Sequence, residues 1–359
     1  MEQFDRALGM LDLMPQPAFC VRCGKIIKAN PAAAAFLIES GQDIDTLLRT
    51  GAEEYKDFEG GCLYLTLALA GGSFGASVTR MQDFDVFCVD SSDTDAHLQA
   101  MALAAKELRE PLGSLMVMAD KLFPEESHTN PQVREQVSHM NRSLFRMLRI
   151  IGNMSDAGRY AAESGARLEI RDLCAVLDEV FCRAADLAAE AGISLHYTGH
   201  SESIYTLADA QKVERIVYNI LSNAMKFTPA GGRIEAKLTR RGNKLYLSIS
   251  DNGSGIDANL NGSLFSRYLR QPTLEDSRYG LGLGMVLIRS TAALHGGTVL
   301  VDSPENAGTR ITVSFSICQG DATLRSPRLQ FDYAGERDHG LIELSDVLPA
   351  HLYNPESVN

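Results

Sequence analysis

Arg215-Ile-Val-Tyr-Asn-Ile-Leu-Ser-Asn-Ala-Met-Lys-Phe-Thr228 is the stretch on which the interpretation of this 359-residue chain depends. Its apolar residues recur at helical spacing, which predicts an amphipathic helix. Asn219, Asn223 and Lys226 fall along one polar side of that helix. Two amides and an ammonium group therefore line one stripe.

Three more pieces follow this helix. Asp251-Asn-Gly-Ser-Gly-Ile256 comes directly after an alternating strand, and its glycines allow a tight backbone turn beside a carboxylate. Leu264-Phe-Ser-Arg-Tyr-Leu-Arg270 is the third piece, and Gly280-Leu-Gly-Leu-Gly-Met285 opens a helical run as the fourth. Each piece alone is a weak signal, because a helical Asn is usually a surface residue and a short glycine run is common.

Together, in this order and spacing, the four pieces resemble the Bergerat-type ATPase domain of sensor histidine kinases, with its N box, two glycine boxes and F box. The resemblance implies ATP and Mg²⁺ as cofactors. It places Asp251 on the adenine amine, the second glycine box and Lys226 on the phosphates, and Asn223 on the metal. The expected nucleotide-binding residues are Asn219, Asn223, Lys226, Asp251, Gly253, Gly255, Arg267, Gly280, Gly282 and Gly284.

The first polar position of the N box separates the kinases from other ATPases of this type. Gyrase-like and chaperone relatives carry a glutamate there that activates water, whereas this chain has Asn219. An amide cannot act as a general base, so rapid direct hydrolysis of ATP is not expected. A gyrase-class or chaperone-class ATPase is therefore the least favoured interpretation.

Upstream, two stripes of apolar residues spaced three and four apart run over residues 98–122 and 133–154. Pro124 and Pro131 bracket a polar loop between them, which predicts two helices folded into an antiparallel hairpin. One hairpin would leave an apolar seam exposed. Two copies forming a four-helix bundle would bury it, as in the dimerisation domain of histidine kinases.

The resemblance breaks inside the first of these helices. The phosphoacceptor box of the family is H-E-L-R-T-P-L, and this chain has Lys106-Glu-Leu-Arg-Glu-Pro-Leu112, so Glu107 and Arg109 match as catalytic-box residues while Lys106 replaces the histidine. A lysine ammonium has no free lone pair at neutral pH and cannot attack the γ-phosphate. Three other nearby histidines are interpreted as surface residues: His97, His128 and His139.

The N-terminal residues predict a small sensory domain. Two short strands separated by Cys23-Gly24, then Asn30, Ala33 and a helical run, resemble the opening of a PAS domain, and three more strands are expected at 63–69, 75–80 and 83–89. A plain dimerisation domain is the alternative for this region. No haem or flavin motif is recognisable, and no cofactor is assigned to it.

Composition excludes several classes of protein. A net charge of −12 argues against a general nucleic-acid or anionic-membrane surface. No apolar run is long enough to cross a bilayer and the first residues lack a signal-peptide layout, so a cytoplasmic location is expected. Seven cysteines contain a single C-x-x-C at Cys20 and Cys23, without the second ligand pair that zinc requires.

We therefore expect an α/β (α+β) protein with a PAS-like sensory domain at 1–92 and a dimerisation hairpin at 93–162. A Bergerat ATPase α/β sandwich at 163–318 and a tail of unknown role at 319–359 complete it. The leading function is a two-component signalling protein that binds Mg-ATP and acts as a pseudokinase or regulatory scaffold. The alternative is an active protein-histidine kinase that phosphorylates a partner or a non-standard residue. Expected partners are a second copy or another histidine kinase, with a response regulator also possible.

Overall fold

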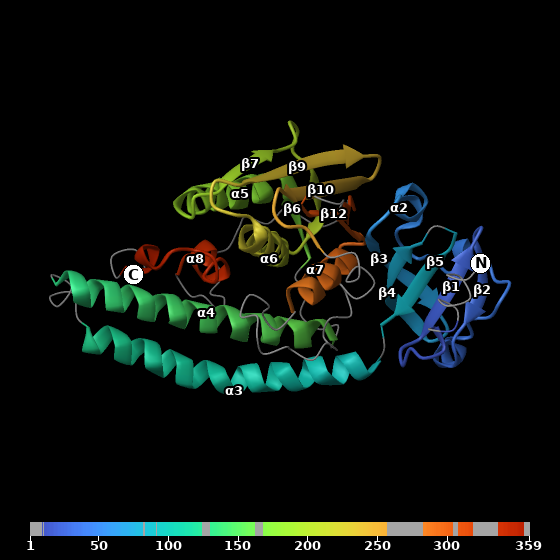
Figure 1. The fold of residues 1–359 in the computed structure, drawn as a ribbon, viewed down its shortest axis with the longest axis horizontal. Coiled ribbons are helices and arrows are strands. Elements are labelled where there is room, and N and C mark those ends of the chain that lie inside the picture. Colours follow the sequence, from blue (N-terminus) through green and yellow to red (C-terminus); the bar gives the residue numbers. More distant parts are fainter. Residues whose placement is uncertain are drawn as a thin grey trace.

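The computed structural model describes residues 9, 11–81, 83–90, 92–123, 130–161, 168–256, 283–303, 308–318 and 337–354. Figure 1 shows two long helices side by side, an α/β domain lying along them, and a smaller β-domain at one end. Within the described residues, no helix combines the length and the apolar character needed to span a membrane.

The N-terminal domain is a five-stranded antiparallel sheet with short helices. Its elements are β1 (Ala18–Arg22), β2 (Lys25–Ala29), η1 (Pro31–Phe36), η2 (Ile44–Thr46), α2 (Ala52–Asp57), β3 (Cys62–Leu69), β4 (Gly72–Arg80) and β5 (Asp85–Val89). The strand order is β2-β1-β5-β4-β3. The helical run expected after Asn30 is the 3-10 helix η1, and the Asn30 side chain caps it by accepting a hydrogen bond from the Ala33 amide.

Two 31-residue helices follow, α3 (Ser92–Leu122) and α4 (Pro131–Ala161), and they run antiparallel to one another. Every seventh position of α3 is buried among the side chains of α4 and the α/β domain, at Leu98, Ala105, Leu112 and Ala119. The companion heptad positions Leu108, Leu115 and Leu122 are 48%, 51% and 72% exposed. The predicted seam therefore divides into one edge buried within the chain and one open edge.

The α/β domain consists of β6 (Glu169–Asp172), α5 (Leu173–Glu190), β7 (Ser194–Thr198), β8 (Tyr205–Ala208), α6 (Ala210–Phe227), β9 (Arg233–Arg241), β10 (Lys244–Asp251), α7 (Leu283–Leu294), β11 (Val299–Asp302) and β12 (Arg310–Ser316). Strands β11-β12-β10-β9-β7 form a mixed sheet, with only the β9–β7 pair parallel. Strand alternation buries one face of β9 and β10 beneath helices α5 and α6. Asp172 and Asp209 cap the two helices by accepting backbone amides.

The two sheets are joined into one ten-stranded sheet, an arrangement that the sequence did not predict. Strand β3 pairs antiparallel with β11, with Tyr64 opposite Val299 and Cys62 opposite Val301. Glu54 of α2 receives hydrogen bonds from Lys244 Nζ at 2.7 Å and from the Tyr246 hydroxyl at 3.0 Å. Burial raises the pKa of Glu54, but these donors outweigh it and lower the pKa below its ordinary value.

A second polar contact joins the N-terminal domain to α7. Arg289 of α7, only 5% exposed, donates to Asp90 at 2.7 Å, and its guanidinium lies 5.3 Å from the centre of the Tyr64 ring. The Tyr64 hydroxyl donates to the same carboxylate at 2.7 Å. The N-terminal domain therefore contacts both an edge strand and a helix of the α/β domain.

The last described residues return to the helical pair. Helix α8 (His339–Glu343) and the 3-10 helix η6 (Ala350–Tyr353) lie between α4 and the helices α5 and α6 (Figure 1). Apolar side chains of residues 339–353 are buried in the core of the α/β domain, at Leu341, Ile342, Leu344, Leu348 and Tyr353.

Candidate nucleotide-binding site

The polar stripe predicted on 215–228 lies on α6, an amphipathic helix with ten buried residues. Asn219 is 1% exposed, and its Nδ2 donates to the Arg215 carbonyl at 2.9 Å. Asn223 and Lys226 are half-buried on the same side, one and two turns further along. The three side chains thus follow one line toward the C-terminal end of α6.

Helix α7 packs against α6 beside this line. Gly284, in its first turn, faces the amides: a β-carbon at this position would lie 3.4 Å from Asn219 Oδ1 and 3.9 Å from Asn223 Nδ2. The absence of a side chain keeps the space over the two amides open at the start of a helix, where backbone N–H groups favour an anion. Gly280, Gly282 and Arg267 lie outside the described residues.

Asp251 ends β10 and is 9% exposed. Its Oδ1 accepts hydrogen bonds from the Gly253 amide at 2.9 Å and the Thr309 amide at 3.2 Å. Burial raises the pKa of this carboxyl group, and the two amides partly offset the effect. A buried carboxylate with one oxygen held by the backbone is well placed to accept from a ligand amine with the other.

Close backbone approaches surround this carboxylate. A β-carbon on Gly308, where φ is +76°, would collide with the Asp251 carbonyl, and one on Gly253 would lie 2.5 Å from the Phe227 carbonyl. Gly255, at φ +71°, adopts the left-handed conformation that favours glycine. Gly253 and Gly255 were expected from the sequence, whereas Gly308 and Thr309 were not. Their only sequence signal is a glycine two residues before the strand β12.

His295 fixes α7 relative to α6. The side chain is 6% exposed, its Nε2 accepts from the Asp209 amide at 3.0 Å, and its Nδ1 donates to the Thr291 carbonyl at 2.7 Å. Burial lowers the pKa of this imidazole, which agrees with a neutral ring that donates from one nitrogen and accepts at the other. It joins the end of α7 to the N-cap of α6 and has a structural role.

The positions that resemble the acceptor box lie on α3. Residues 106–111 of α3, which include Lys106, Glu107 and Arg109, are exposed. Within the described residues, α3 meets α7 through Leu98 and Met101, which pack with Leu283, Val286 and Leu287. His139 is exposed on α4, while His128 and the side chain of His97 lie outside the described part.

Residues 208–318 match the family described as Histidine kinase-, DNA gyrase B-, and HSP90-like ATPase. This range contains α6, Asp251 and α7, and it defines the class of the domain.

Similar proteins indicate which branch of this ATPase family the chain resembles. The chain is 30% identical over 276 residues to a protein described as a sensor-like histidine kinase of Rhizobium meliloti (strain 1021), covering 72% of this chain and 52% of the relative. It is 25% identical to the adaptive-response sensory kinase SasA of Rippkaea orientalis, covering 61% of this chain and 58% of the relative. The domain match and these relatives support an assignment to the histidine kinase family. The chain spans only part of the length of each relative.

Among solved structures, full-length ShkA in complex with AMPPNP is similar at 22% identity and a TM-score of 0.47, covering 62% of this chain and 46% of that chain. A mycobacterial sensor histidine kinase, MprB, matches at 27% identity and a TM-score of 0.35, covering 42% of this chain and 98% of that chain.

Proposed function

We propose that the chain is a two-component signalling protein that binds Mg-ATP between α6, α7 and the end of β10, and that it regulates or scaffolds a partner. The observation that carries this is the juxtaposition of the Asn219 and Asn223 amides with Gly284, beside a buried Asp251. Asp251 would accept the adenine amine, and the amides with Lys226 would face the phosphates.

A magnesium ion fits the same line of residues. Mg²⁺ prefers oxygen ligands and takes few from the protein, so the Asn223 side-chain carbonyl together with phosphate oxygens and waters is a reasonable shell. When bound, the ion would neutralise phosphate charge. Within the described residues, no group of three His, Cys, Asp or Glu side chains competes as a metal site.

Lys106 carries the regulatory part of the proposal. It occupies the position of the acceptor histidine in the resembling box, and its ammonium group cannot attack phosphorus at neutral pH. The alternative, an active kinase that phosphorylates a histidine of a partner, is favoured by the exposure of residues 106–111, which leaves this side of α3 accessible. Incubation with labelled ATP and candidate partner kinases or response regulators tests both. Label in a partner but not in this chain would select the alternative.

We also propose that the N-terminal domain is a PAS-like sensor and that α3 and α4 form a four-helix bundle with a second copy or another histidine kinase. The open heptad edge of α3 supports the bundle, because three exposed leucines in one line are costly in water. A cytoplasmic location and a response-regulator partner stay predictions.

The variant Leu108→Glu combined with Leu115→Glu is expected to be monomeric in light scattering at micromolar concentration, because it places two charges on the open edge of the seam. Leu112 is unsuitable for this test, since it is 4% exposed within the chain itself. Leu103→Glu is the matched control, being 64% exposed but outside the seam, and it should leave the dimer intact. A monomeric wild type would contradict the bundle.

A further inference from the structure

The C-terminal segment 337–354, to which the proposed function assigns no role, touches two parts of the molecule at once. Its apolar side packs into the α/β domain, where Leu341 and Ile342 are buried. At its other end the Tyr353 ring meets Phe145 of α4 edge-on, with ring centres 5.5 Å apart. The Tyr353 hydroxyl donates to the Leu341 carbonyl at 2.7 Å and closes the segment on itself.

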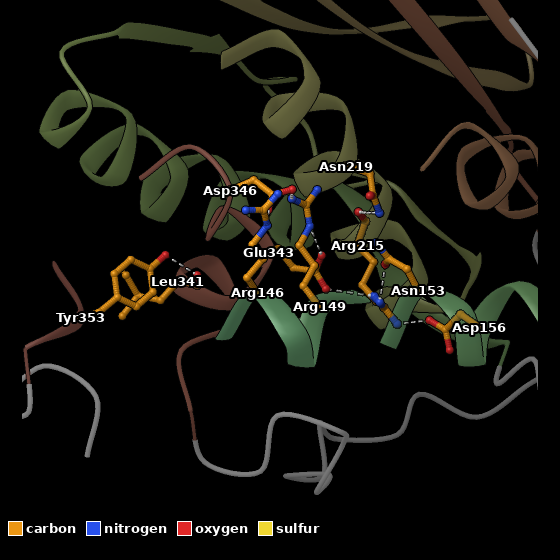
Figure 2. A network of polar contacts seen from close by, with 10 residues as sticks. All are labelled: Arg146, Arg149, Asn153, Asp156, Arg215, Asn219, Leu341, Glu343, Asp346 and Tyr353. Carbon is orange, nitrogen blue, oxygen red and sulfur yellow. Dashed lines mark hydrogen bonds and ion pairs between the residues drawn. The ribbon is translucent and has the colours of Figure 1, made fainter. Parts of the chain in front are cut away.

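The polar side of the segment is held by arginines of α4 (Figure 2). Arg149 is 7% exposed, and its Nη1 donates to Asp346 Oδ2 at 2.7 Å. The Nε of Arg146 lies 2.7 Å from the other oxygen of the same carboxylate. Arg142 donates to the carbonyls of Ser345 and Asp346 at 3.1 and 3.2 Å. Residues 142, 146 and 149 share one face of α4, so the segment is clamped along about two turns.

The same network reaches the helix of the candidate site. Glu343, fully buried, lies 3.6 Å from Arg149 Nε and 3.2 Å from Arg215 Nε. Arg215 is also paired with Asp156 and donates to Asn153 Oδ1 at 2.8 Å, both on α4. The Arg215 carbonyl accepts a hydrogen bond from Asn219. The C-terminal segment, α4 and the first part of the predicted stripe on α6 therefore meet at Arg215 (Figure 2).

Buried ion pairs contribute little net stability, because desolvation offsets their attraction, but removing one partner is costly. The attraction within such a network weakens when its charges move apart. Here the acids belong to the tail and α4, while the arginines belong to α4 and α6. The network is therefore complete only while the ATPase domain rests on α4.

We propose that residues 337–354 are an intramolecular latch that fastens the ATPase domain to α4. With the latch closed, the domain stays on α4 and the start of α3, and residues 106–111 remain uncovered. Release of the latch frees the ATPase domain to approach the box on α3. Residues 337–354 thereby set how often a bound nucleotide reaches that box. This consequence rests on the proposed nucleotide site. The contacts that form the latch do not depend on that site.

The test uses Asp346→Ala in the full chain, because it removes the carboxylate held by Arg146 and Arg149 without shortening the tail. Hydrogen exchange of 339–353 is expected to accelerate at least tenfold, and small-angle scattering is expected to report a larger radius of gyration at the same oligomeric state. Asp186→Ala, an exposed aspartate of α5 outside the network, is the matched control and should change neither. Faster exchange with an unchanged radius would overturn the latch, since the tail would then be only a part of the core.

A second readout uses phosphoryl transfer. In a Lys106→His background, adding Asp346→Ala is expected to speed self-labelling from ATP at least tenfold, and an unchanged or slower rate contradicts the latch. If the Lys106→His chain takes no label at all, the bundle or lid is not in catalytic geometry for transfer to residue 106, and the scattering comparison decides the latch. A chain ending at residue 336 should behave as Asp346→Ala does if it remains folded by circular dichroism.

Discussion

Lys106→His is expected to produce acid-labile, alkali-stable labelling from γ-labelled ATP, where the wild type shows none. The imidazole supplies the lone pair that the ammonium group lacks, and Glu107 beside it can accept a hydrogen bond and orient the ring. The position is exposed on α3, so the new side chain meets no packing obstacle. The measurement is labelled phosphate per chain, with mapping of the labelled residue.

Lys106→Ala is the control and should stay unlabelled, because it removes the ammonium group without adding a nucleophile. Adding Glu110→Thr to Lys106→His should increase the yield, since a glutamate one turn along adds negative charge near the incoming phosphate. Strong wild-type labelling at His97, His128 or His139 would instead favour an active kinase with a relocated acceptor.

Asp251→Ala is expected to weaken nucleotide binding strongly in calorimetric titration with ATP and magnesium. Loss of a buried hydrogen bond to the adenine amine costs about 1 to 3 kcal/mol, which is roughly a 5- to 150-fold loss of affinity. The structure adds a second effect, because the Gly253 and Thr309 amides lose their acceptor.

Asp251→Asn separates these two effects. It retains the size of the side chain and one carbonyl oxygen for the backbone amides, but it removes the charge and replaces the other acceptor with a donor that opposes the adenine amine. We expect native thermal stability to be largely retained and binding to be weak. Affinity equal to that of the wild type in both variants would exclude Asp251 as the adenine ligand.

The local parts of this site were predictable from sequence for physical reasons. The stripe on α6 follows from helical periodicity, and the need for glycine beside Asp251 follows from a turn that leaves no room for a β-carbon. The partners that complete the site were not predictable. Thr309 is 58 residues from Asp251 and meets it only because β12 pairs with β10.

The packing of the helices α3 and α4 could be predicted from the sequence only in part. Heptad spacing predicted an apolar seam, and the buried leucines agree with it, but spacing alone cannot tell which edge packs inside the chain. Leu112 and Leu115 are both seam positions, yet one is 4% and the other 51% exposed. The contacts of the C-terminal segment 337–354 could not be predicted from the sequence. Glu343 and Asp346 are ordinary charged residues in sequence, and only the fold places them against Arg149 and Arg215.

The ten-stranded sheet shared by the two domains affects which fragments of this chain should remain well behaved in solution. Removing the N-terminal domain would strip β3 from β11 and uncover a row of backbone donors and acceptors, together with the apolar Leu300, which packs against the N-terminal core. A bare strand of this kind templates pairing with other chains, so a fragment beginning at residue 163 should be prone to aggregation. The N-terminal domain thus covers the β11 edge of the ATPase sheet.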